Sequence, residues 1–301
     1  MRSTLDPKTD IVFKMLFGDP RNSSLLIKLL NAVLQPPQPI VEVKVLNPEP
    51  LKDATDAKEI ALDVRAAGAD GTLYDVEMQC RRHPAYRERT LYYLSHLYVS
   101  QLSEGEGYVK LRPCRAIWIT DFRELEGERF HSTFRLLEVH EHEEFSGDLE
   151  LHFLELPKLP GAVERGDEPV ATKWGRFLKA EDDEELEALA MGDRDLKEAK
   201  EALERLSADP QARRLAEQRR LARLSYELDI NKTREEALLE GRAEGRAEGR
   251  AEGLLQAIES ACEFLEIALD EARRSRLAQS DVTALESVLS HLRRERRWPE
   301  G

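Results

Sequence analysis

Two short runs decide the fold: Leu62-Asp63-Val64-Arg65-Ala66, and Leu73-Tyr74-Asp75-Val76-Glu77-Met78-Gln79-Cys80. Apolar and polar residues alternate along most of both runs, which is typical of β-strands with two different faces. The residues between them, Gly68-Ala69-Asp70-Gly71, contain the Asp-Gly pair that favours a tight turn. The stretch therefore predicts a β-hairpin.

The two faces of this hairpin differ in chemistry. Because residues two apart on a strand share a face, Val76 and Met78 belong to the core, whereas Glu77 and Gln79 point together to the other side. Asp63, on the partner strand, is expected to point with Glu77. Carboxylate and amide oxygens are ligands that suit Mg²⁺ or Mn²⁺. The same pattern is also typical of a solvent-exposed face that carries acids, so the pattern alone leaves both interpretations open.

Outward from the hairpin, the sequence predicts alternating helices and strands. A strand over 41–45 precedes the hairpin, and a helix over 85–103 follows it, before an apolar strand at 116–120. Helices at 10–17 and 23–34 open the chain, and further strands are expected at 134–140 and 149–156. A helix between strands of one sheet indicates an α/β fold with a mixed sheet.

Charged residues make up 35% of the chain and concentrate after Glu181, where the pattern becomes helical. We expect a globular domain over 1–173, a helical extension over 174–239, and a final helical region over 240–301. Helices are predicted at 184–206, 210–228, 254–272 and 281–296.

A four-residue Glu-Gly-Arg-Ala repeat opens the last of these regions. On a helix each repeat advances only about 40° around the axis, so Gly241, Gly245, Gly249 and Gly253 would form one slowly winding row. Glycine is a poor helix former, so a flexible linker is one interpretation. The other is a smooth groove for a second helix, which would make the chain a homodimer.

Composition limits the class of protein. The net charge of −14 argues against a passive binder of nucleic-acid backbones, although it does not exclude a nuclease with a local basic patch. The three cysteines are far apart and form no CxxC pair, which favours a reducing cytoplasm over a disulfide framework or zinc cluster. No run approaches the ~20 apolar residues of a membrane span, and the start lacks the apolar core of a signal peptide.

Several motifs in order resemble one known family. They are Thr9-Asp10-Ile11-Val12-Phe13-Lys14-Met15-Leu16-Phe17-Gly18, Leu62-Asp63-Val64-Arg65, Tyr74-Asp75-Val76-Glu77-Met78-Gln79, the spaced residues from Arg89 to Tyr108, and Leu151-His152-Phe153-Leu154-Glu155-Leu156-Pro157-Lys158. Together they look like the recombination-promoting nuclease and putative transposase family of the PD-(D/E)XK nuclease superfamily. The resemblance covers about residues 5–160 with ordinary spacing.

The resemblance implies a restriction-endonuclease-like core, magnesium-dependent DNA cleavage and a role in recombination by mobile sequences. It makes Asp63 and Glu77 the metal ligands. Gln79 stands where the wider superfamily has lysine, which leaves the means of activating water open. Asp10 matches an acid on the first helix, but a helix N-cap explains Asp10 equally well.

A basic cluster follows the acidic strand. Arg81, Arg82, Arg87 and Arg89 lie within nine residues, and we interpret them as groups that position DNA phosphates. A solvated surface is the simpler alternative for such a cluster.

Two other classes of function remain. One is a nuclease fold without activity that serves as a DNA-binding or assembly module. The other is a helical interaction protein that works through residues 180–301. The presence of Asp63, Glu77 and Gln79 favours the enzyme.

Overall fold

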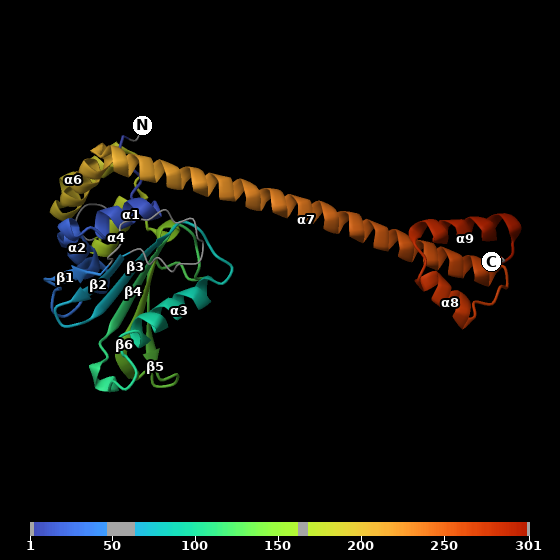
Figure 1. The fold of residues 1–301 in the computed structure, drawn as a ribbon, viewed down its shortest axis with the longest axis horizontal. Helices are drawn as coiled ribbons and strands as arrows, with labels where there is room; N and C mark the ends of the chain where they lie inside the picture. The colour runs from blue at the N-terminus through green and yellow to red at the C-terminus, as the bar shows by residue number, and fades with distance from the viewer. Residues whose placement is uncertain (1–2, 47–63, 162–167, 300–301) are drawn as a thin grey trace. The chain divides into compact units, whose positions relative to one another are not determined.

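The computed structural model describes residues 3–46, 64–161 and 168–299 of the chain (Figure 1). The chain forms two compact units, residues 1–220 and 221–301. The boundary expected at residue 173 falls inside a helix, α4 (Val170–Lys179), whose buried residues belong to the main core of the first unit.

The first unit contains a mixed six-stranded sheet in the order β1-β2-β3-β4-β6-β5, which confirms the predicted α/β class. The predicted hairpin is present as the antiparallel pair β2–β3, whereas β3, β4 and β6 run parallel. The strands are β1 (Val43–Val45), β2 (Val64–Gly68), β3 (Leu73–Gln79), β4 (Cys114–Thr120), β5 (His131–Leu137) and β6 (Glu144–Glu155).

Helices cover the two faces of the sheet unequally. The main core joins β3 to α1 (Asp10–Phe17), α2 (Ser23–Leu34) and α4, and it contains Val76 and Met78, as the alternation predicts (Figure 1). The other face packs against α3 (Tyr86–Val99), which connects the parallel strands β3 and β4. The strand β3 is therefore an interior strand with both faces covered.

Aromatic side chains bind the helical layer together. The Phe13 and Phe17 rings lie 4.6 Å apart between centroids, and the Phe17 ring meets the Trp174 ring edge-on at 5.9 Å. Phe13, Phe17 and Trp174 are all buried, so α4 is an integral part of this core. This packing explains why the first unit extends beyond residue 173.

The helix predicted over 184–206 is two helices, α5 (Asp183–Gly192) and α6 (Arg194–Ala208). The side chain of Asp193 accepts hydrogen bonds from the backbone N–H groups of Asp195 and Leu196, and so caps α6. An aspartate just after a glycine interrupts the helical periodicity that the prediction followed.

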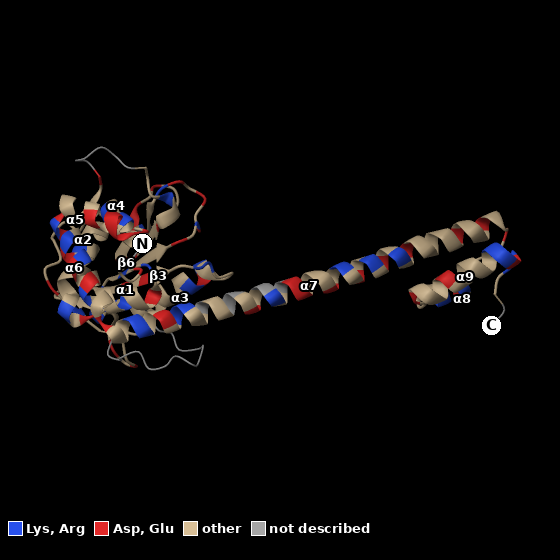
Figure 2. Cartoon of the chain, turned by 90° about the horizontal axis from the view of Figure 1, so that it is seen from above, with Lys and Arg blue, Asp and Glu red and all other residues tan. Residues whose placement is uncertain are grey.

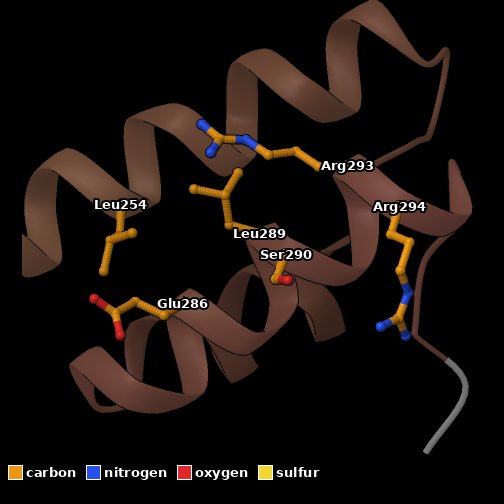
Figure 3. A pocket seen from close by; sticks show the side chains of 6 residues that line it. All are labelled: Leu254, Glu286, Leu289, Ser290, Arg293 and Arg294. Carbon is orange, nitrogen blue, oxygen red and sulfur yellow. The ribbon is translucent and has the colours of Figure 1, made fainter.

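The C-terminal unit has a small core of its own. Residues from α7 (Pro210–Phe264), α8 (Glu271–Ala278) and α9 (Val282–Glu295) bury Ile258, Leu285 and Leu292. The helix predicted over 254–272 therefore ends at Phe264, and α8 follows it as a separate helix. This unit has a pocket of about 550 Å³. Figure 3 shows the side chains that line it, which are those of Leu254, Glu286, Leu289, Ser290, Arg293 and Arg294.

The Glu-Gly-Arg-Ala repeat is helical over its whole length and forms part of α7. The interpretation of the repeat as a flexible linker is therefore wrong. Apart from the backbone of the helix itself, a methyl group added at Gly241, Gly245, Gly249 or Gly253 would meet no atom of the described residues within 4 Å. No helix in the described part of the chain is both long enough and apolar enough to cross a bilayer.

Candidate active site

The two polar groups at the end of β3 lie together, as predicted. The Nε2 atom of Gln79 donates a hydrogen bond to Oε2 of Glu77 at 2.9 Å. Both residues occupy alternate positions of β3, opposite Trp118 and Thr120 of β4 in the parallel ladder. Glu77 and Gln79 therefore share the face that packs against α3.

Of the two interpretations of this face, the solvent-exposed one is wrong for Glu77, because its exposed fraction is 0%. Alternation of polar and apolar residues indicates a solvent-exposed face only when the sheet is covered on one side. Here α3 packs on the face of β3 that carries the polar residues, and Trp118 of β4 lies in the layer between α3 and the sheet. The carboxylate is interior.

A second interior acid shares this face. Asp75 precedes Glu77 by two residues and is also 0% exposed. Arg65 of β2 lies directly opposite Asp75 in the antiparallel ladder. Asp75 is not among the site residues predicted from the sequence, although the two-residue period that groups Glu77 with Gln79 also includes Asp75.

Asp63, the other expected metal ligand, lies outside the described residues. It directly precedes Val64, which is paired with Val76 across the hairpin. The expected meeting of Asp63 with Glu77 thus stays a prediction.

Asp10 is the first residue of α1, and the N-cap position belongs to Thr9. One oxygen of Asp10 accepts a hydrogen bond from the backbone N–H of Ile11. The other accepts from Nε and Nη2 of Arg219 in α7, at 2.8 and 2.5 Å. The N-cap interpretation is therefore wrong, and the charge of Asp10 is balanced by an arginine that sequence spacing could not reveal.

Arg82 and Arg87 share one partner. Their Nε atoms each donate to the carboxylate of Glu124 at 2.8 Å, and Arg87 also donates to the Glu124 carbonyl oxygen. Burial raises the pKa of Glu124, but the hydrogen bonds from the two arginines outweigh burial and hold that pKa below its usual value. These contacts fix the start of α3 to the loop after β4.

Arg89 behaves differently from Arg82 and Arg87. Its guanidinium lies over the rings of Tyr93 and Trp118, with centroid distances of 5.1 and 5.9 Å. This cation–π arrangement places the arginine in the same layer as Glu77, because Trp118 is the partner of Glu77 in the ladder. Arg81 is half-buried just after the end of β3.

A buried ion pair supports the loop that carries Glu124. The Nζ atom of Lys158 donates to Oε2 of Glu155 at 2.5 Å and to the Leu125 carbonyl oxygen at 2.6 Å. The other oxygen of Glu155 accepts from the backbone N–H groups of Glu124 and Leu125. The motif that carries Glu155 and Lys158 thus holds the partner of Arg82 and Arg87 in place.

The donor chemistry of the site suits a hard divalent cation. Glu77 and Asp75 offer carboxylate oxygens, and no soft sulfur ligand accompanies them on this face of β3. Within residues 3–46, 64–161 and 168–299, no group of three or more His, Cys, Asp or Glu side chains is arranged to hold a metal ion. Asp63, the other expected ligand, lies outside these ranges.

Because Glu77 is buried, we expect its side chain to contribute more to stability than an exposed acid does. Replacing Glu77 by alanine should lower the free energy of unfolding by roughly 1–3 kcal/mol, because it leaves a cavity and removes the acceptor of Gln79. Glu88, exposed on α3, is the control, and Glu88→Ala should change stability by less than about 0.5 kcal/mol. Urea denaturation of both variants measures the difference, and equal values would mean that Glu77 is not interior.

Comparison with known proteins supplies the family. No curated protein and no solved structure matches the chain significantly. The family model described as PD-(D/E)XK nuclease family transposase matches residues 7–235, which is most of the chain and includes β3, α3 and the Glu155–Lys158 motif. The chain belongs to the PD-(D/E)XK nuclease family transposases.

Proposed function

We propose that this chain is a metal-dependent DNA endonuclease that hydrolyses phosphodiester bonds, in recombination or in the transposition of mobile elements. The observation that carries the proposal is the Glu77 carboxylate on β3, which accepts a hydrogen bond from Gln79 in a nuclease-family fold. Carboxylate oxygens are the ligands that a hard divalent cation such as Mg²⁺ prefers.

Asp63 and Glu77 would hold the cation, Mg²⁺ or alternatively Mn²⁺. When bound, such an ion supplies charge that orients a water and stabilises the leaving oxygen of the phosphodiester. Gln79 fixes the orientation of the Glu77 carboxylate through its 2.9 Å hydrogen bond. As a neutral amide, Gln79 can orient a water but cannot lend it positive charge. Asp10, held by Arg219, is the further acid that we assign to the site.

The four arginines after β3 would contact the DNA backbone. Arg81, Arg82, Arg87 and Arg89 gather around the start of α3, on a chain whose net charge is −14. Arg82 and Arg87 stay more than half exposed despite their contacts with Glu124. They can therefore add a phosphate contact on their solvent side, which makes phosphate positioning compatible with their role in fixing α3.

A second candidate function is a nuclease fold without activity that acts as a DNA-binding or assembly module. The complete burial of Glu77 favours this candidate, because a ligand to a catalytic ion needs access to the substrate. The two candidates differ in one observable, the cleavage of DNA.

Supercoiled plasmid separates the two candidates. The chain should nick or linearise the plasmid with Mg²⁺ or Mn²⁺ and leave it intact with EDTA. Asp63→Asn and Glu77→Gln should abolish cleavage, whereas Glu88→Gln, which changes an exposed acid on α3, should not. Agarose gels of the topological forms measure the outcome. Cleavage at the wild-type rate by Glu77→Gln would refute the site, and no cleavage by the wild type would favour the module.

The free thiols Cys80, Cys114 and Cys262 suit a reducing compartment, and we propose that the protein works in the cytoplasm.

We also propose that α7 pairs two copies of the chain. Basic and acidic residues alternate along α7, as Figure 2 shows, so the Arg row of one helix can face the Glu row of another. The glycines present no side chain, and the described residues of 240–253 are almost all exposed. Leu221, Leu224 and Leu228 add an exposed apolar stripe at helical spacing before the repeat.

Sedimentation tests this pairing. The full chain should sediment as a dimer, and a version that ends near Leu239 should sediment as a monomer or as a much weaker dimer. The shorter version keeps the whole first unit, residues 1–220, so its fold can be checked by circular dichroism. If both versions have the same oligomeric state, the repeat is not the interface.

A further inference from the structure

The C-terminal unit carries seven arginines in two short runs, in a part of the chain that has no lysine after Lys232. The first run lies in α8, and the second lies at the end of α9, where Figure 2 shows basic residues close together. The arginines are Arg273, Arg274, Arg276, Arg293, Arg294, Arg296 and Arg297. Glu295 is the one acid within these two runs.

The fold brings the two runs together. The guanidinium of Arg273 lies over the ring of Trp298, 5.0 Å from the ring centroid, so α8 contacts the segment that follows α9. Leu277 of α8 and Leu292 of α9 are buried in the same small core. The seven arginines and Trp298 thus belong to one surface of this unit, which we call the arginine surface.

Helix stability explains only part of this surface. Cations in the last turn of a helix interact favourably with the helix dipole. That interaction accounts for Arg276, Arg293 and Arg294. Arg273 and Arg274 lie in the first half of α8, where the dipole disfavours positive charge, and Arg296 and Arg297 follow the last residue of α9. These four arginines need another explanation.

The second run has little neutralising charge. Arg294 pairs with Glu295 at 2.9 Å. Within the ranges that the structure describes, Arg293, Arg296 and Arg297 form no ion pair, and all three are exposed. The first run is similar, because its two leading arginines donate to backbone carbonyl oxygens, which carry no net charge. The arginine surface is therefore strongly positive on a chain whose net charge is −14.

The chemistry of this surface suits phosphate groups. A guanidinium binds phosphate through two parallel hydrogen bonds, which a lysine cannot do. Arg293 and Arg294 line the 550 Å³ pocket together with Ser290, whose hydroxyl is a further donor (Figure 3). Trp298 adds an aromatic ring, a group on which nucleic-acid bases stack.

An anionic membrane is the other large partner that arginines fit. Helices that lie on a membrane insert exposed apolar side chains between the lipids. Among the described residues that follow Phe264, no large apolar side chain is exposed. The surface therefore favours a nucleic acid over a membrane.

We propose that the arginine surface of the C-terminal unit binds the phosphate backbone of DNA. The inference goes beyond the proposed function, because α8 and α9 lie outside residues 7–235, which the family model matches. It requires neither cleavage nor a divalent ion. The surface would hold DNA irrespective of its sequence, since phosphate contacts carry no sequence information.

Salt-dependent binding tests the surface. Anisotropy of a short fluorescein-labelled DNA duplex measures affinity for the full-length protein, in EDTA so that metal-dependent cleavage cannot interfere. Replacing Arg293, Arg296 and Arg297 together by glutamine should weaken binding about tenfold or more. It should also lower the slope of log affinity against log salt by about two to three, because each lost phosphate contact removes about 0.9 from that slope.

The matched control changes the net charge equally. Arg21, Lys110 and Arg220 are exposed cations that each pair with a nearby acid, at 2.6, 2.7 and 2.8 Å. Replacing these three together by glutamine should leave both the affinity and the salt slope close to those of the wild type. Circular dichroism should show that both triple variants keep the wild-type helix content.

Three results would overturn the proposal. They are wild-type affinity and slope in the first variant, equal losses in both variants, and a loss by the first variant of binding to phosphatidylglycerol vesicles alone. The test is independent of the proposed cleavage. A protein that cuts plasmid but binds DNA equally well without the three arginines refutes only the surface. A protein that cuts nothing, yet loses affinity in the first variant, supports the surface and refutes the nuclease.

Discussion

The Glu77 carboxylate lies in the interior of the first unit, on a strand whose two faces are both covered. Placing a carboxylate there is costly, and the cost increases because Asp75, two residues earlier, is interior as well. The surrounding elements supply what the two acids need. Gln79 donates to Glu77, and Arg65 stands across the ladder from Asp75. The hairpin thus carries two buried acids, together with the amide and the arginine that lie next to them.

The covering of this strand depends on how α3 is anchored. Glu155 and Lys158 form a buried pair at the end of β6 and hold the loop that carries Glu124. Glu124 in turn accepts hydrogen bonds from Arg82 and Arg87, which flank the start of α3. Residues far apart in the sequence thereby fix one helix over Glu77. Loss of any link should loosen α3 before it disturbs the main core, since that core lies on the opposite face.

The local sequence pattern was enough to predict the hairpin, the first two helices and the common face of Glu77 and Gln79. The periods of a strand and of a helix, two and 3.6 residues, can be recognised from residues that are close together in the sequence. The burial of Glu77 was not predictable in this way, because it depends on α3, which packs there through contacts distant in sequence. The same holds for Arg219, whose ion pair with Asp10 joins residues 209 positions apart. Only Asp75 could have been found earlier from its strand position.

The proposed cleavage chemistry depends on a cation held at Glu77. Titration of Mn²⁺ into the full-length protein, followed by the electron paramagnetic resonance of the free ion, measures that binding without any cleavage. The wild type should remove Mn²⁺ from solution saturably, and Glu77→Gln should lose this site while its circular dichroism stays unchanged. Glu88→Gln, with an exposed acid altered on α3, should bind as the wild type does. Equal Mn²⁺ binding by the wild type and Glu77→Gln would contradict the account.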